Sequence, residues 1–201
     1  MSSQQEPSSR SLRLASSQRS VLLVVDVQEK LLPIMPSSRH FLWNVQRLLR
    51  AADLLGVPRL VTEQYPERLG ATVAELSVSP QTVTSKRMFS CRECADRLRP
   101  MWDAGARQAI ICGLESHVCV LQTALDLENT GWQVFVVVDA ISARRRLDHE
   151  VAISRLQSSG CTLITVEAVL FEWCETSLAP AFKSISQLVR EPPPETDGVK
   201  P

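Results

Sequence analysis

The sequence predicts a three-layer α/β/α domain in which helices cover both faces of a parallel, six-stranded sheet. Strand-like apolar runs alternate along the chain with amphipathic helical segments, which is the pattern of consecutive βαβ units. Two of the runs, 21–27 and 133–139, are nearly unbroken apolar stretches rich in Val, as expected for strands that helices cover on both sides. With 201 residues, the chain is long enough to bury the core of one such domain.

Six strands are expected, each a short apolar run of β-forming residues bounded by turn or helix signals. In chain order they are 21–27, 59–62, 82–84, 108–113, 133–139 and 162–166. Four helices are expected at 41–55, 118–130, 148–159 and 180–190. The first three end at Gly56, Gly131 and Gly160, because glycine readily adopts the left-handed backbone conformation that terminates a helix.

One domain is expected, from 20 to 190, because this range shows neither an internal repeat nor a linker. Residues 1–19 are rich in Ser, Gln and Arg and contain one acidic residue, which predicts a disordered N-terminal tail. Mitochondrial transit peptides share this composition, so that alternative stays open, whereas the apolar core of a secretory signal is missing. Residues 191–201 contain four prolines and are expected to form a disordered, Pro-rich C-terminal tail.

Composition and charge argue against several classes of function. Lys+Arg and Asp+Glu both total 22, so the net charge of +0 lacks the basic excess that a dedicated nucleic-acid binder usually carries. The chain has no apolar stretch long enough to predict a membrane-spanning helix. Its six cysteines, in a chain without an export signal, are expected to be reduced thiols. We therefore expect a cytoplasmic protein that binds neither nucleic acid nor a membrane.

Three chemically useful side chains follow three different strands of the predicted sheet. Asp26 ends the first strand, Lys86 follows the third, and Cys119 lies in the first turn of the helix after the fourth. Ligands of such sheets bind beyond the carboxyl ends of the strands. A buried Asp beside a Lys⁺ remains ionised and can accept the proton of a thiol, so the three residues together predict a nucleophilic cysteine site.

Each of these residues alone has an ordinary structural interpretation. Asp26 can cap a loop, as Asp139 can at a comparable place, Lys86 can be solvated, and Cys119 can be a buried structural thiol. Ser116 is a suitable N-cap, which would place Cys119 near the third helical position. At that position the helix dipole and the unpaired amides favour a thiolate and can hold an oxyanion.

Two further motifs leave alternatives open. Cys91 and Cys94 form a CxxC pair that is unlike a zinc site because no second Cys or His cluster accompanies it. Ser90 and Glu93 form a capping-box pattern, which predicts an ordinary helix start, although a CxxC pair at such a place can be redox-active. The arginines at 144–146 are either solvated or contact an anionic substrate.

Three segments of the sequence resemble the motifs of the isochorismatase-like cysteine hydrolases. They are VVDVQ at 24–28, SKRMF at 85–89 and GLESHVCV at 113–120, in an order and spacing that cover about 21–189. TEQYP at 62–66, followed by Leu69 and Gly70, is similar to the isochorismatase domain-containing subgroup. The resemblance implies a parallel six-stranded sheet with helices on both faces, and a homo-oligomer.

The same resemblance assigns expected roles to the three residues. Asp26 would be the base, Lys86 would hold Asp26 and the substrate in register, and Cys119 would be the nucleophile. The backbone amides of Glu115 and Cys119 would form the oxyanion hole after a cis peptide at Leu114–Glu115. By motif position, the substrate-binding walls would be Gln28, Gln64, Tyr65 and Phe89, which can equally be packing residues.

Departures from the family narrow the expected substrate. The Asp-x-His metal motif of nicotinamidases is replaced by Glu63-Gln64-Tyr65, so we expect no metal and no cofactor. Isochorismatases that cleave a vinyl ether do not need the cysteine, so its presence favours attack on a small amide, carbamoyl or related carbonyl substrate through a covalent intermediate. Two alternatives remain: a non-catalytic scaffold or ligand-binding module on the same fold, and a CxxC thiol-redox protein.

Overall fold

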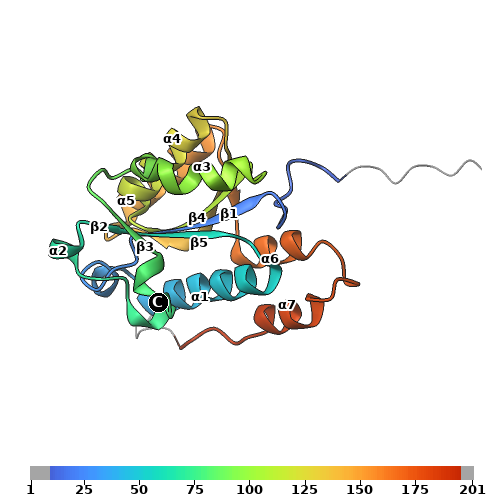
Figure 1. Cartoon of the computed structure of the whole chain (residues 1–201). Coiled ribbons are helices and arrows are strands. Elements are labelled where there is room, and N and C mark those ends of the chain that lie inside the picture. Colours follow the sequence, from blue (N-terminus) through green and yellow to red (C-terminus); the bar gives the residue numbers. More distant parts are fainter. Residues whose placement is uncertain (1–9, 196–201) are drawn as a thin grey trace, which may run out of the picture.

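The computed structural model describes residues 10–195 and contains a six-stranded sheet between two layers of helices (Figure 1). All strand pairs of the sheet are parallel, and the strand order is β3-β2-β1-β4-β5-β6. The strands span Ser20–Val25 (β1), Arg59–Gln64 (β2), Val83–Lys86 (β3), Gln108–Leu114 (β4), Gln133–Ser142 (β5) and Thr162–Ile164 (β6). The predicted fold class is therefore confirmed.

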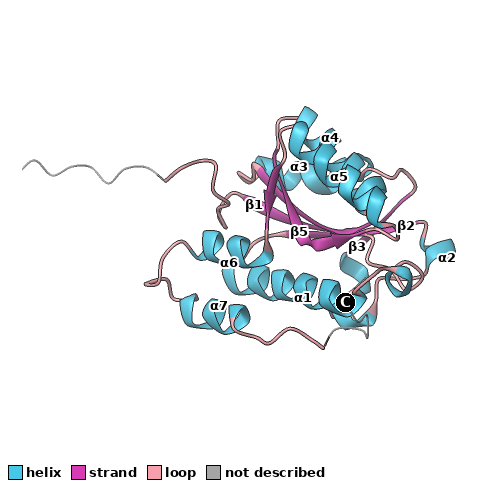
Figure 2. Ribbon diagram, turned by 180° about the vertical axis from the view of Figure 1, so that it is seen from behind, coloured by secondary structure: helices cyan, strands magenta, loops and turns pink. Residues whose placement is uncertain are grey.

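Helices α1, α6 and α7 cover one face of the sheet, and α3, α4 and α5 cover the other (Figures 1 and 2). The α-helices span Ser38–Leu55 (α1), Pro66–Leu69 (α2), Ala95–Asp103 (α3), Leu121–Asn129 (α4), Arg146–Ser158 (α5), Val166–Cys174 (α6) and Phe182–Val189 (α7). A π-helical turn, Ser116–Val120, precedes α4, and 3-10 turns lie at Leu32–Ile34, Ala74–Leu76, Pro80–Thr82 and Cys91–Cys94. Among the helices of residues 10–195, none combines the length and apolarity needed to cross a membrane.

Helices α2 and α6 were not among the expected elements, and α3 was expected only through the helix start predicted at Ser90. Pro100 lies inside α3 and weakens the helical pattern there, since proline removes a backbone hydrogen bond. The sixth strand was expected to continue to residue 166, but β6 ends at Ile164. The Thr165 hydroxyl accepts a hydrogen bond from the backbone N–H of Ala168 at 3.4 Å and so caps the start of α6.

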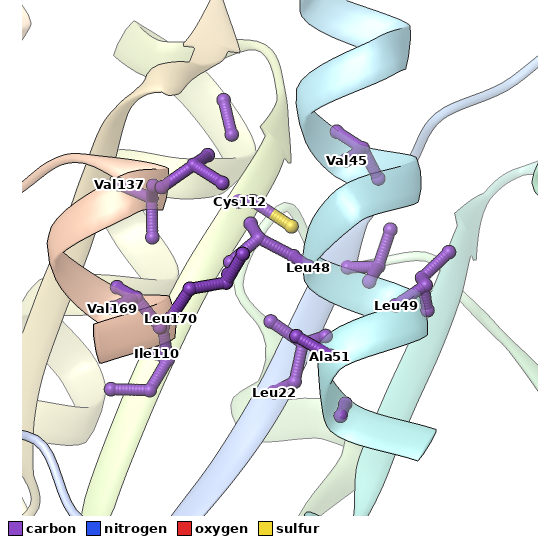
Figure 3. Close-up of a cluster of buried hydrophobic side chains, with 14 of the residues drawn as sticks. Leu22, Val45, Leu48, Leu49, Ala51, Ile110, Cys112, Val137, Val169 and Leu170 are labelled. Carbon is purple, nitrogen blue, oxygen red and sulfur yellow. The ribbon is translucent and has the colours of Figure 1, made fainter. Parts of the chain in front are cut away.

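The core consists of two layers of apolar side chains, one on each face of the sheet. Alternate residues of β1 point to opposite faces, so Leu22 and Val24 join one layer, and Val21, Leu23 and Val25 the other. Figure 3 shows part of the first layer, where side chains of α1 and α6 pack onto the central strands. The side chains labelled there are Leu22, Val45, Leu48, Leu49, Ala51, Ile110, Cys112, Val137, Val169 and Leu170.

Gly113 allows the ends of the two central strands to approach closely. It pairs with Val25 in the β1–β4 register and has a φ of +123°, a backbone conformation that favours glycine. A Cβ atom at this position would lie 2.0 Å from the Val25 carbonyl oxygen. The missing side chain therefore brings the residues that follow β1, beginning with Asp26, next to the turn that follows β4.

The segment before β1 packs against the body of the domain. Arg10 Nη1 lies 2.5 Å from Glu175 Oε1, and the backbone N–H of Ala15 donates to Glu172 Oε2 at 2.6 Å. Ala15 is fully buried, and the backbone N–H of Ser16 donates to the Gln108 side chain at 2.8 Å. Within the described residues, contacts with the domain thus already include Arg10, ahead of residue 20, the expected start of the domain. Residues 1–9 and 196–201 of the expected tails lie outside the described residues.

Candidate functional site

The carboxyl ends of β1 and β3 bring Asp26 and Lys86 together inside the domain. Lys86 is the last residue of β3, and Asp26 follows β1 with a positive φ of 53°, which ends the strand two residues earlier than expected. The Lys86 Nζ lies 2.7 Å from Asp26 Oδ2, and both side chains are completely buried. A buried ion pair of this kind needs further hydrogen bonds to offset the cost of removing both charges from water.

Lys86 obtains those hydrogen bonds from the surrounding loops. Its ammonium also donates to Gln64 Oε1 at 2.8 Å, to the Phe89 carbonyl at 3.0 Å and to the Met88 carbonyl at 3.3 Å. Burial by itself would lower the pKa of Lys86, but the charge of Asp26 and its hydrogen bond raise that pKa above the ordinary value. Lys86 is therefore a positive charge at neutral pH.

The second oxygen of the Asp26 carboxylate is held by Thr62, which the sequence did not single out. The Thr62 hydroxyl donates to Asp26 Oδ1 at 2.8 Å, and the Asp26 backbone N–H donates to the Thr62 carbonyl at 3.1 Å. Thr62 pairs with Val25 in the β1–β2 register and is almost fully buried. One signal could have identified Thr62 in the sequence. It is a hydroxyl residue near the carboxyl end of a mainly apolar strand, and that strand neighbours the one that precedes the predicted base.

Cys119 lies beside the ion pair with only 5% of its surface exposed. Burial raises the pKa of the Cys119 thiol, and the charge of Asp26 and a hydrogen bond with its carboxylate raise that pKa further, against the opposite effect of Lys86. The resting group is therefore a thiol. Desolvation thus opposes the thiolate that a helix start favours, and the proton that Asp26 is expected to accept is present on the sulfur.

The turn that carries Cys119 differs from the expected helix start. Glu115, not Ser116, is its N-cap residue, and the Leu114–Glu115 peptide bond is cis, as the family resemblance implied. The backbone N–H groups of Val118 and Val120 both donate to the Glu115 carbonyl, at 3.0 and 3.2 Å. The Ser116 hydroxyl is instead 3.1 Å from His149 Nδ1, so it is not available to cap the helix.

Arg144 holds the first residue of this turn. Its Nε lies 3.1 and 3.0 Å from the two carboxylate oxygens of Glu115, and its backbone N–H donates to Glu115 Oε2 at 3.1 Å. The Glu115 side chain is buried, whereas that of Arg144 is largely exposed. One arginine of the 144–146 run thus contacts the protein itself and fixes the loop between β4 and α4.

The four residues expected to line the pocket fall into two classes. Gln28 is fully buried: its amide donates to the Gln64 and Gly70 carbonyls at 3.1 and 2.7 Å and accepts from the Gln64 backbone N–H at 2.8 Å. The Gln64 side chain connects Lys86 to the Arg87 carbonyl. In contrast, Tyr65 and Phe89 are 41% and 51% exposed.

The CxxC pair lies close to the same cluster. Cys91 and Cys94 are buried free thiols in a 3-10 turn that Ser90 caps by accepting from the Arg92 backbone N–H at 3.1 Å. The expected capping box is incomplete, because the Glu93 carboxylate binds the backbone N–H groups of residues 87 and 88 instead. Cys91 Sγ lies 3.8 Å from the Thr62 hydroxyl.

A hollow lies between the Cys119 turn and α5. Its volume is about 270 Å³, and His117 and Leu121 from the turn and helix α4 form part of its wall. The Nδ1 atom of His117 is buried without a hydrogen-bond partner, and its Nε2 lies 3.9 Å from Asp148 Oδ2. His117 therefore contacts α5.

Known proteins show the same domain. The family model described as the isochorismatase domain matches residues 20–168. Isochorismatase domain-containing protein 2 from Danio rerio is 40% identical over 184 residues, which cover 90% of this chain and 92% of that protein. The Bos taurus protein of the same name is 41% identical over 180 residues, covering 88% and 86%. The solved structure of the MAR1 ribonuclease from Caenorhabditis elegans has a TM-score of 0.83 and 35% identity, covering 94% of this chain and 97% of the other.

Proposed function

Because this chain belongs to the isochorismatase family, we propose that it is a cysteine hydrolase that cleaves a small amide, carbamoyl or related carbonyl substrate through a covalent intermediate on Cys119. The observation that carries the proposal is the completely buried Asp26–Lys86 pair beside a thiol. A structural ion pair needs no neighbouring thiol, and a structural thiol needs no neighbouring charges. The combination suits proton transfer from sulfur to carboxylate.

The first half of the proposed reaction forms an acyl-enzyme. Asp26 accepts the Cys119 proton as the sulfur attacks the carbonyl carbon, so that a C–S bond forms and the carbonyl electron pair moves onto oxygen. The backbone amides of Glu115 and Cys119 hold this oxyanion. When the carbonyl re-forms, the C–N bond breaks and the proton on Asp26 passes to the leaving nitrogen.

The second half consumes one water molecule. Asp26 accepts a proton from the water as it attacks the thioester carbon, and the C–S bond then breaks. The departing sulfur takes back the proton, which leaves a carboxylic acid product and the resting thiol. Lys86 keeps its charge throughout and holds the carboxylate of Asp26 in its reactive orientation.

The base is essential in this scheme because Cys119 rests as a thiol. Burial and the Asp26 carboxylate raise the pKa of Cys119, so few molecules hold a thiolate before substrate arrives. Attack therefore has to be coupled to proton transfer. Tyr65 and Phe89 are the residues of the expected walls that remain exposed for a substrate, while Gln28 and Gln64 support the loops around Lys86.

The test follows a covalent adduct. The protein is incubated with a panel of small amides and carbamoyl compounds, and separately with iodoacetamide, and the modified residue is located by intact mass and peptide mapping. We expect label on Cys119 in the wild type and none in Cys119→Ala, whereas Asp26→Asn reduces labelling. Labelling of Cys119 no faster than that of Cys112 or Cys161, which are also buried, would contradict the proposal.

A ligand-binding module without turnover is the second candidate. It is favoured by the small exposed fraction of Cys119 and by the engagement of both glutamine side chains within the protein. Thermal-shift measurements with the same compounds separate the two candidates. Binding that is equal in the wild type and in Cys119→Ala, without product from any compound, would favour the module.

A CxxC thiol-redox function has less support. Both thiols are buried, whereas the attacking thiol of a redox-active pair is partly exposed. The reduction potential of Cys91 and Cys94 decides the matter. A potential as low as that of a structural disulfide, or failure to form the bond, would exclude this function.

RNA belongs in the substrate panel because the C. elegans neighbour is named a ribonuclease. A polyanion would need unpaired positive charge near the site. Of the four arginines that directly follow β3 and β5, Arg145 is exposed and forms no ion pair within residues 10–195. The other three are paired with glutamates: Arg87 with Glu67, Arg144 with Glu115 and Arg146 with Glu150. These pairs favour a small substrate over a nucleic acid, and RNA cleavage that requires Cys119 would reverse that preference.

The protein is further proposed to act as a homo-oligomer in the cytoplasm. Six free thiols fit a reducing compartment. Light scattering after size-exclusion chromatography measures the mass of the particle, and imaging of the full-length chain measures its location. A mass of one 22.4 kDa chain would contradict the oligomer.

A further inference from the structure

We infer that Thr62 is a positioning residue for the base, and that the Cys91 S–H group is the donor that orients the Thr62 hydroxyl. The inference rests on the proposed role of Asp26 as the base. It also gives a role to Cys91, the first cysteine of the CxxC motif, which the proposed reaction does not use.

The side chains of Cys91, Thr62 and Asp26 form a hydrogen-bond chain that ends at the Asp26 carboxylate. Cys91 Sγ lies 3.8 Å from Thr62 Oγ1, and Thr62 Oγ1 lies 2.8 Å from Asp26 Oδ1. All three side chains are buried. Cys91 is itself fixed, because its backbone N–H donates to the Thr123 hydroxyl oxygen at 2.9 Å.

The direction of this chain follows from counting protons. The ionised Asp26 carboxylate beside Lys86 has no proton and can only accept, so the single hydroxyl proton of Thr62 points to Asp26. The Thr62 oxygen then has only lone pairs to offer to Cys91. Cys91 must therefore be the donor to Thr62, and the hydrogen bonds run in one direction from Cys91 through Thr62 to Asp26. Cys94, the second cysteine of the motif, is in turn a side-chain hydrogen-bond partner of Cys91.

The chain has a consequence for the base. Lys86 holds Oδ2 of the carboxylate and Thr62 holds Oδ1, so the carboxylate cannot rotate about its bond to Cβ. The charged or titratable groups that face the carboxylate are Lys86 from β3, Cys119 from the π-helical turn and Cys91 from the 3-10 turn.

The decisive variants differ only in the hydroxyl. Thr62→Val keeps the shape of the side chain and removes the donor, while Thr62→Ser keeps the donor. We measure the rate of Cys119 alkylation by iodoacetamide against pH, which requires no knowledge of the substrate. In Thr62→Val we expect the rate at pH 7 to fall about tenfold, the typical effect of removing a donor to a charged group. We also expect the acid limb of the profile to move to higher pH, and Thr62→Ser to restore both.

A matched control removes a similar hydrogen bond elsewhere. Thr72 Oγ1 donates to Glu63 Oε1 at 2.8 Å, the same length as the bond to Asp26. Thr72→Val should leave the Cys119 profile unchanged. A Thr62→Val profile that coincides with that of the wild type, or an equal shift in Thr72→Val, would overturn the positioning role.

The donor direction has a separate readout that does not depend on activity. Infrared difference spectra between the wild type and Cys91→Ala isolate the S–H stretching band of Cys91. We expect this band to move to higher frequency in Thr62→Val, because the thiol loses its acceptor. No S–H band from Cys91 in the wild type, or a band that Thr62→Val leaves in place, would overturn the direction of the chain.

Two outcomes distinguish this inference from the proposed hydrolysis. If no compound of the substrate panel gives product but the Cys119 profile shifts in Thr62→Val, the hydrolase proposal fails and the positioning role stands. If amides are hydrolysed but Thr62→Val has wild-type kcat and KM and an unshifted profile, the positioning role fails alone. Should Thr62→Val not fold, the same hydrogen-bond chain is tested at Cys91 by comparing Cys91→Ala, which has no donor, with Cys91→Ser, which keeps one. Only Cys91→Ala should then slow the alkylation of Cys119. Equal alkylation rates in the two variants would overturn the role of the Cys91 donor.

Discussion

Lys86 is the residue on which the interior charges depend. An ammonium and a carboxylate that are both removed from water attract each other strongly but lose their hydration, so the pair is favourable only with additional partners. Lys86 finds three such partners and Asp26 finds Thr62. The four donated or accepted bonds explain how the chain tolerates two full charges inside an apolar core.

Replacing Lys86 with Met should therefore destabilise the protein. Asp26 would remain as an unpaired buried carboxylate, which costs about 3–5 kcal/mol of unfolding free energy. Urea unfolding at pH 7 measures the loss. Lys30→Met is the control, since Lys30 is exposed and, within residues 10–195, its ammonium donates only to the Arg68 carbonyl. A loss that is equal in the two variants would show that the buried pair contributes no special stability.

Cys112 predicts a decrease in stability on the alkaline side. Complete burial raises the pKa of the Cys112 thiol above its ordinary value. The unfolded chain then loses this proton near pH 8.5 while the folded chain keeps it, so the contribution is full below that pH and decreases above it. Urea unfolding from pH 7 to 10 should show a decline that is smaller in Cys112→Ala by up to ~1.4 kcal/mol per pH unit. Parallel curves for the two proteins would contradict this.

Residues of the site differ in how well the sequence predicts them. Asp26, Lys86 and Cys119 follow strand ends and carry distinctive chemistry, so the sheet rule and the motifs together place them on one edge. Thr62 escapes notice because threonine is an ordinary β-forming residue. Its importance depends on the register of β2 against β1, which the sequence does not state.

At the scale of elements, the close approach of β1 and β4 depends on one glycine. Gly113→Ala would place a Cβ 2.0 Å from the Val25 carbonyl oxygen at a φ of +123°. Because backbone atoms on both strands would have to move, we expect a loss above ~3 kcal/mol.

Gly56→Ala provides the comparison for that variant. Gly56 also has a positive φ, but nothing lies within 4 Å of a Cβ built there. Its loss should be only ~1 kcal/mol. Chemical denaturation of both variants measures the difference. Comparable losses would mean that the positive φ, rather than the contact with Val25, decides the effect.

The elements also show where local signals mislead. Ser116 has the residue type of an N-cap, but the hydrogen bonds of the π-helical turn start at Glu115 and its hydroxyl pairs with His149. That outcome depends on α5, which is distant in sequence. Strand positions were easier to predict, because burial on both faces leaves an apolar run in the sequence itself.

At the scale of the whole molecule, residues 10–19 connect β4 and α6, because the segment forms hydrogen bonds with both elements. The composition of this segment predicts a disordered tail. Its hydrogen bonds to Glu172 and Gln108 come from backbone N–H groups, so they leave no periodic pattern in the sequence that could be recognised. Ala15 is the single apolar residue of the segment that is fully buried. Its burial depends on a surface that exists only after the domain has folded.

Shortening the protein at its N-terminus tests whether the contacts of residues 10–19 stabilise the domain. A chain that starts at Arg10 keeps every contact described here, whereas one that starts at Ser20 loses Ala15 and its hydrogen bonds. We expect the second to unfold at a lower temperature, with a loss of about 2–3 kcal/mol from the vacated contacts. Thermal melts of both shortened proteins and of the full-length protein measure this loss. Identical melting temperatures of the two shortened proteins would contradict a stabilising role of residues 10–19.

The strand order has a consequence for the order of events during folding. β1 lies between β2 and β4, so Asp26 meets Lys86 within the first half of the chain, but Cys119 arrives only when β4 has crossed back to the middle of the sheet. Pairings between distant segments close large loops and form slowly. Cys119, the proposed nucleophile, should consequently reach the site after Asp26 and Lys86 have met. In a refolding experiment, the rate at which Cys119 gains its reactivity would report the moment when the two halves of the molecule join.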